Sequence, residues 1–86
     1  MQVFRHKNFA KQYRKLNSKK QALVDTAISL FYENPFDERL RNHPLKGKYK
    51  GCNSIDAAFD LRIIFKQEKN YFIVILLKIG NHSQLY

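Results

Sequence analysis

The spacing of the apolar residues changes along this chain, and that change restricts its fold more than any other feature. Phe9, Tyr13 and Leu16 recur at the spacing of a helix, and the same spacing returns after Asn17 and Ser18. Beyond residue 51 the apolar residues alternate instead, which is the period of a strand buried on one face. The pattern therefore predicts an α+β fold in which helices come first and strands follow.

The first half of the chain is expected to form a helical hairpin. One helix should span residues 7–16, and a second should span residues 18–34 and end at an Asn-Pro pair. Ser18 and Gln21 have the spacing of a capping box at the start of the second helix. Before the first helix, the adjacent apolar residues 3 and 4 could form a short edge strand.

The second half is expected to supply a small antiparallel sheet. Residues 35–51 hold both prolines and two of the three glycines, which is typical of a loop that crosses the surface. Three strands should follow, at residues 53–59, 60–66 and 71–79. We expect one domain of residues 1–86, with the N-terminal helical hairpin packed on this sheet.

The chain is strongly basic, with sixteen Lys and Arg against seven Asp and Glu and a formal net charge of +9. Such a charge favours a polyanionic partner such as nucleic acid or an acidic protein, although it could also only keep the surface soluble. The lone Cys52 cannot form an internal disulfide, and Met1 leads directly into a polar segment. We therefore expect a cytoplasmic protein, and no apolar run reaches the roughly 20 residues of a membrane span.

The sequence lacks the common motifs of metal-dependent, nucleotide-dependent and serine hydrolases. It has no Cys/His metal spacing, no phosphate-binding glycine loop and no Ser/His/Asp signature, so we expect no metal or cofactor. Any hydrolysis must use ordinary acids, bases and cations. RNA permits this because its own 2′-hydroxyl can attack the neighbouring phosphorus, which leaves proton transfer and charge stabilisation to the protein.

Three residues in the last third of the chain suit these roles. Asp60 and Arg62 are two apart on an expected strand and should share a face, where Arg can bind two phosphate oxygens. His82 follows the last strand, where an imidazole can exchange protons with a substrate. The alternatives are a structural ion pair or solvated face for the first two and a plain surface residue for His82. Proximity of His82 to Arg62 decides between these interpretations.

The segment from His43 to Gly51 interleaves a His with three Lys and a Tyr. Lysines can contact phosphates and a tyrosine can stack on an unpaired base, so the loop suits single-stranded RNA. A basic solvated loop is the alternative interpretation. The candidate RNA-binding residues are Lys46, Lys48, Tyr49 and Lys50.

Three short motifs together resemble a known family. His-Pro-Leu-Lys-Gly at 43–47, Asp-Leu-Arg at 60–62 and Gly-Asn-His-Ser-Gln-Leu-Tyr at 80–86 are similar to RelE/ParE-superfamily toxins of the YafQ type. The resemblance implies a RelE-like fold and a toxin that its cognate antitoxin neutralises. It also implies mRNA cleavage on the ribosome without a metal, by 2′-hydroxyl attack, to leave a 2′,3′-cyclic phosphate and a 5′-hydroxyl.

The same resemblance implies roles for five residues. His43 and Asp60 would transfer protons or position the substrate, and Arg62 would bind the phosphate. His82 would be the general acid, and Tyr86 would stack on the substrate. Two positions depart from the pattern: Asp56 stands where YafQ-like chains have a His, and Leu61 stands where they have an aromatic residue.

Two other functions remain open from the sequence. A ParE-like inhibitor of DNA gyrase would share the fold without cutting RNA, but it would have no need for a proton donor such as His82. A non-catalytic module that binds RNA or an antitoxin would keep its RNA affinity when His82 is removed.

Overall fold

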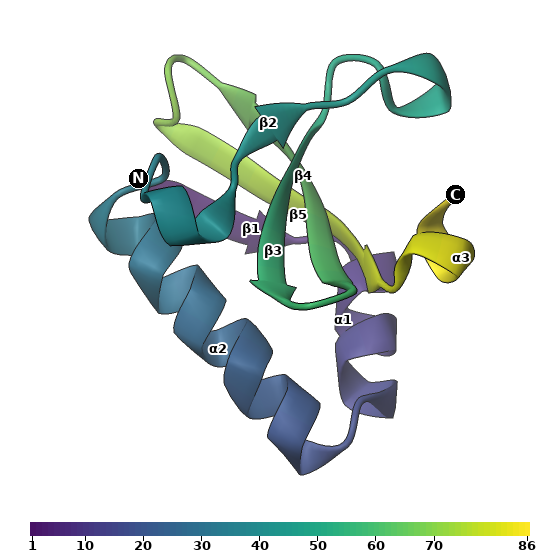
Figure 1. The fold of residues 1–86 in the computed structure, drawn as a ribbon. Helices are drawn as coiled ribbons and strands as arrows, with labels where there is room; N and C mark the ends of the chain where they lie inside the picture. Colours follow the sequence, from purple (N-terminus) through teal and green to yellow (C-terminus); the bar gives the residue numbers. More distant parts are fainter.

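Two helices cover one face of a five-stranded sheet in the computed structural model, which describes residues 1–86 (Figure 1). The predicted α+β fold is confirmed. In chain order the elements are β1 (Gln2–Arg5), α1 (Lys7–Lys15), α2 (Ser18–Glu33), η1 (Glu38–Leu40), β2 (His43–Pro44), η2 (Gly47–Tyr49), β3 (Asn53–Ala58), β4 (Leu61–Glu68), β5 (Ile73–Gly80) and α3 (His82–Leu85).

The predicted hairpin of α1 and α2 is present, but its cap differs from the prediction. Asn17 is the N-cap of α2, and its side chain accepts a hydrogen bond from the backbone N–H of Lys20 at 2.8 Å. Ser18 is already the first helical residue, so it cannot act as the cap. The Gln21 amide donates instead to the Tyr13 carbonyl at 2.9 Å, which ties the two helices together. No helix is both long enough and apolar enough to cross a membrane.

The sheet has the strand order β1-β5-β4-β3-β2 and is mixed. β2 to β5 pair in antiparallel fashion, as predicted, whereas β1 pairs parallel to β5, with Val3 opposite Val74. The expected edge strand at residues 3 and 4 is therefore confirmed, but the sheet is not wholly antiparallel. A local pattern can identify a strand, whereas its partner and direction depend on contacts with residues far along the chain.

The main core lies between the helices and the sheet. Phe31 of α2 meets Phe65 of β4 edge to face, with ring centroids 5.0 Å apart, and both side chains are fully buried. Ile55 and Ile63 contribute to this core from β3 and β4. Burial of these apolar side chains is the main force that holds the helices to the sheet.

A second, smaller cluster lies on the other face of the sheet. Tyr49 of η2 and Leu85 of α3 pack there against Ile64 of β4. The Tyr49 hydroxyl donates a 2.7 Å hydrogen bond to the Leu85 carbonyl. This cluster fixes η2 and α3 on the face that α1 and α2 leave open.

Candidate active site

The pairing of β3, β4 and β5 brings three residues into one row across the sheet. Asp56 lies opposite Arg62, and Arg62 lies opposite Gly80. Leu61 and Ile63, which flank Arg62, point into the core under the helices. Because successive side chains of a strand alternate, Arg62 and Asp56 point to the opposite face.

Arg62 lies between an acid and an imidazole. Its Nε is 3.7 Å from Oδ1 of Asp56, and its Nη1 is 3.4 Å from Nδ1 of His82. The expected proximity of His82 to Arg62 is therefore confirmed. A guanidinium has only donors, so it faces an unprotonated Nδ1, and a neutral His82 then carries its proton on Nε2. This arrangement leaves Nε2–H free to donate.

His82 is held in place through the backbone of α3. Asn81 caps this helix and forms a capping box with Gln84, with both hydrogen bonds at 2.8 Å. The Asp60 carboxylate accepts a further hydrogen bond from the backbone N–H of His82 at 3.0 Å. The position of the imidazole therefore depends on three acceptors, Gln84 inside α3 and Asn81 and Asp60 outside it.

Asp60 does not lie on β4, so the prediction that it shares a strand face with Arg62 is wrong. It occupies the turn between β3 and β4 with a φ of 55°, and β4 begins at Leu61. Aspartate tolerates this left-handed conformation better than most residues, which lets the hairpin close there. The alternation of side chains starts one residue later than the sequence suggested.

Tyr86 packs directly on the candidate acid. Its ring centroid is 4.8 Å from that of His82 and 5.5 Å from that of Tyr49. The Tyr86 side chain is 45% exposed, so part of the ring remains open to a ligand. The structure thus brings Tyr86 to the same place as Arg62 and His82.

Tyr49 is a core residue, which corrects its prediction as a base-stacking residue of a solvated loop. It is only 9% exposed, and its hydroxyl is engaged by the Leu85 carbonyl. The neighbouring Lys46, Lys48 and Lys50 are exposed. They remain candidates for phosphate contact around the site.

His43 lies on β2, with its Cα opposite that of Ser54, and is exposed. Ser54 is two residues from Asp56 on β3, so His43 belongs to the same face of the sheet as Arg62. Neighbouring strands lie about 4.8 Å apart, which places β2 about 10 Å from β4. Nδ1 of His43 is 2.8 Å from the carbonyl oxygen of Arg41. A carbonyl can only accept, so Nδ1 carries the proton and Nε2 of a neutral His43 has a free lone pair.

The family model for the bacterial toxin of type II toxin-antitoxin systems, YafQ, matches residues 1–86. This chain belongs to the YafQ family. It is thus a toxin of a toxin-antitoxin system, as its resemblance to that family predicted. No curated protein matches the chain.

Solved structures support the same fold. YafQ from E. coli strain BL21(DE3) superimposes with a TM-score of 0.83 at 17% identity, covering 99% of this chain and 97% of that one. The E. coli DinJ-YafQ complex gives a TM-score of 0.70 at 19% identity and the same coverage. A YoeB/ParE toxin from Agrobacterium tumefaciens gives 0.78 at 15% identity, covering 95% of this chain and 99% of that one.

The structure shows where the two residues lie that the resemblance predicts to depart from the YafQ-type pattern. Asp56 contacts Arg62, and its other oxygen, Oδ2, is 3.6 Å from Nε of Arg41. Leu61 is buried in the core under the helices. Asp56 therefore belongs to the site and Leu61 to the packing beneath it.

Two cations of the toxin near the site were missed in the sequence. Arg41 precedes β2 and contacts Asp56, and its position two residues before His43 was the available signal. Lys78 of β5 lies opposite Ile64, with Nζ 3.5 Å from the Tyr49 hydroxyl. A single cation inside an otherwise apolar strand was the signal there. The toxin has no group of three or more His, Cys, Asp or Glu side chains that could hold a metal ion.

Proposed function

We propose that this toxin is a ribosome-dependent endoribonuclease that cleaves mRNA without a metal ion. The observation that carries the proposal is the position of Arg62, in contact with Asp56 on one side and His82 on the other. A fixed cation beside a proton donor is what cleavage of a phosphodiester requires. Work on ribosomes would place the protein in the cytoplasm.

The two histidines are proposed to act at opposite ends of the reaction, His43 as the base and His82 as the acid. The free Nε2 of His43 takes the proton of the RNA 2′-hydroxyl, whose oxygen then attacks the adjacent phosphorus. Arg62 stabilises the charge that develops on the phosphate oxygens. His82, as the imidazolium that the bound phosphate favours, gives its Nε2 proton to the departing 5′-oxygen and becomes neutral. The products are a 2′,3′-cyclic phosphate and a 5′-hydroxyl, and no metal is needed because the nucleophile belongs to the substrate.

Asp60 and Tyr86 complete this scheme without transferring protons. Asp60 holds the backbone of His82 and so positions the acid. Tyr86 lies against the His82 ring and offers its exposed part to a base of the RNA. The exposed Lys46, Lys48 and Lys50, within a chain of net charge +9, attract the RNA backbone.

A cognate antitoxin is the second expected partner. The E. coli YafQ is found in complex with DinJ, and this chain shares its fold. An acidic or amphipathic antitoxin segment would complement the basic surface of the toxin. Release from that complex would expose the site to the ribosome.

Primer extension on translated mRNA tests the proposed function. Expression of the wild-type toxin should produce new 5′ ends, and His82→Gln should abolish them. His6→Asn is a matched control, because His6 caps α1 through its side chain and Asn can also act as a cap. Intact mRNA during wild-type expression would refute the proposal. A DNA gyrase supercoiling assay with the purified protein would then test the ParE-like alternative.

A further inference from the structure

We propose that the cavity beside Arg62 is a nucleotide subsite that binds a phosphate and a base of the RNA next to the cleaved bond. This inference rests on the proposed function and extends it. The cavity has a volume of about 410 Å³ and is lined by Arg41, Asp56, Phe59 and Arg62 among others. It lies where the segment before β2 meets the turn between β3 and β4.

Arg41 supplies the free cation of this subsite. Its side chain is 76% exposed, and its only ion pair joins Nε to Oδ2 of Asp56. The two terminal nitrogens make no hydrogen bond or ion pair, so they remain free for a ligand. Two parallel donors of a guanidinium match two oxygens of a phosphate.

The backbone of Arg41 is in a conformation that non-glycine residues rarely adopt. Its φ is 52°, in the left-handed region, at the end of η1. Strained residues of this kind cluster at functional sites. In this conformation the Arg41 carbonyl accepts from His43 while the Arg41 side chain contacts Asp56. Arg41 thus links His43, the proposed base, to Asp56, which contacts Arg62.

Asp56 contacts two arginines that have different free donors. Arg41 and Arg62 both approach its carboxylate through Nε. Nη1 of Arg62 is directed to His82, where the cleaved phosphate must lie, whereas the terminal nitrogens of Arg41 face no protein partner. The arrangement therefore assigns the cleaved phosphate to Arg62 and a neighbouring phosphate to Arg41.

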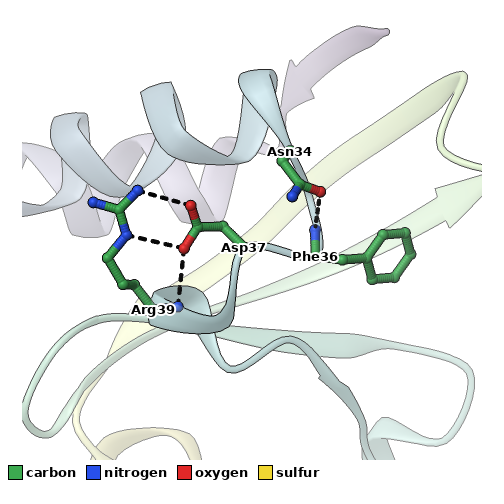
Figure 2. Close-up of polar contacts among 4 residues, drawn as sticks. All are labelled: Asn34, Phe36, Asp37 and Arg39. Atoms are coloured by element: carbon green, nitrogen blue, oxygen red, sulfur yellow. Dashed lines mark hydrogen bonds and ion pairs between the residues drawn. The ribbon is translucent and has the colours of Figure 1, made fainter.

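Arg39 also borders the cavity, but its guanidinium is occupied. Figure 2 shows it turned onto the Asp37 carboxylate, with Nε and Nη2 at 3.0 and 2.8 Å from the two oxygens. Its charge is therefore largely neutralised within the protein. Of the two arginines that the segment before β2 contributes to the cavity wall, Arg41 is the one that remains open to a ligand.

Phe59 distinguishes a nucleotide from a simple anion. It lies in the turn between β3 and β4, and its relative exposure is 102%, so its ring takes no part in the core. An aromatic ring beside guanidinium groups can stack on an unpaired base, which an acidic peptide does not offer. The combination of Phe59 with Arg41 therefore favours RNA over an acidic protein segment.

Single-turnover cleavage of mRNA on programmed ribosomes tests the subsite. Base stacking and a phosphate contact each contribute enough that Arg41→Ala and Phe59→Ala should each raise the half-saturating toxin concentration about tenfold. The effect should fall on this concentration rather than on the maximal rate. Arg41→Lys keeps the charge but loses the two-pronged donor, so its effect should be intermediate.

Two control variants match these changes elsewhere on the surface. Arg14→Ala removes the same charge from α1, and Phe72→Ala removes an exposed ring at the other end of β4. Thermal unfolding should show that all of the variants are folded. If Arg41→Ala and Phe59→Ala saturate at the same concentration as these controls, the subsite is refuted.

Co-sedimentation with ribosomes that carry 2′-O-methylated mRNA separates the subsite from the cleavage proposal. If the wild-type toxin does not cut mRNA but binds this complex more tightly than Arg41→Ala and Phe59→Ala, cleavage fails and the subsite stands. A deca-glutamate peptide tests the competing occupant. If both variants lose affinity for the peptide while their RNA saturation is unchanged, the cavity is a site for acidic protein and the subsite is refuted.

Discussion

The backbone N–H of His82 donates a hydrogen bond to the Asp60 carboxylate at 3.0 Å. This bond joins the start of α3 to the turn between β3 and β4, two segments that are 22 residues apart along the chain. It makes Asp60 an acceptor that fixes the backbone of the candidate acid. A carboxylate engaged in this way is better suited to positioning His82 than to removing a proton from the substrate.

Replacement of Asp60 separates these two roles. Asn keeps an oxygen that can accept from the His82 N–H, so Asp60→Asn should retain cleavage within about tenfold of wild type. Asp60→Ala removes the acceptor and should lose considerably more activity. If Asp60 were the general base, both variants would lose the same factor of roughly 10² to 10⁴. Single-turnover rates of the two variants therefore decide the role of this residue.

The elements of the fold were largely predictable because their local patterns are strong. The helical spacing located α1 and α2, and the alternation of Leu61, Ile63 and Phe65 assigned the buried face of β4 correctly. The parallel pairing of β1 with β5 was not predictable, since no local pattern of Val3 and Phe4 specifies partners 71 residues away.

The candidate site was less predictable than the fold. Phosphate binding by Arg62 and proton exchange by His82 could be proposed from the residue types. Their contact could be expected because adjacent strands can bring them together. The burial of Tyr49 was not, because a Gly-Lys-Tyr-Lys-Gly segment looks solvated until its contact with Leu85 is known. Asp60 was misplaced because the alternation of side chains continues by chance into the turn.

His82 can be tested as the general acid with a substrate that needs no acid. An RNA with sulfur in place of the 5′ bridging oxygen has a leaving group that departs without protonation. His82→Gln should cut ordinary RNA slower than wild type by roughly 10² to 10⁴. With the sulfur substrate, the variant and the wild type should cut at similar rates. A defect of equal size on both substrates would show that His82 acts in some other step.

Tyr49→Phe tests whether Tyr49 is a structural residue. The change keeps the ring but removes the 2.7 Å hydrogen bond to the Leu85 carbonyl, so the buried carbonyl loses its partner. We expect the free energy of unfolding to fall by about 1–3 kcal/mol. Chemical denaturation measures this loss. Tyr32→Phe is the control, because Tyr32 is half exposed and its hydroxyl makes no hydrogen bond, so its stability should match wild type. A Tyr49→Phe variant of unchanged stability would contradict the structural role.

The ion pair of Asp37 with Arg39 should make the thermal stability of the fold decrease as the pH falls in the acid range. Side-chain and backbone hydrogen bonds from Arg39 lower the pKa of Asp37 from 3.8 to about 2. A carboxylate whose pKa is lower in the folded than in the unfolded state stabilises the protein at pH values above its unfolded-state pKa. This stabilisation is lost as the pH falls through the folded-state pKa. The melting temperature of wild type should therefore exceed that of Asp37→Asn above about pH 4, and the gap should close towards about pH 2. Glu68→Gln removes an exposed carboxylate that makes no ion pair, so it should show no such convergence. A gap for Asp37→Asn that stays constant from pH 6 to about pH 2 would mean that the charge of Asp37 does not stabilise the fold.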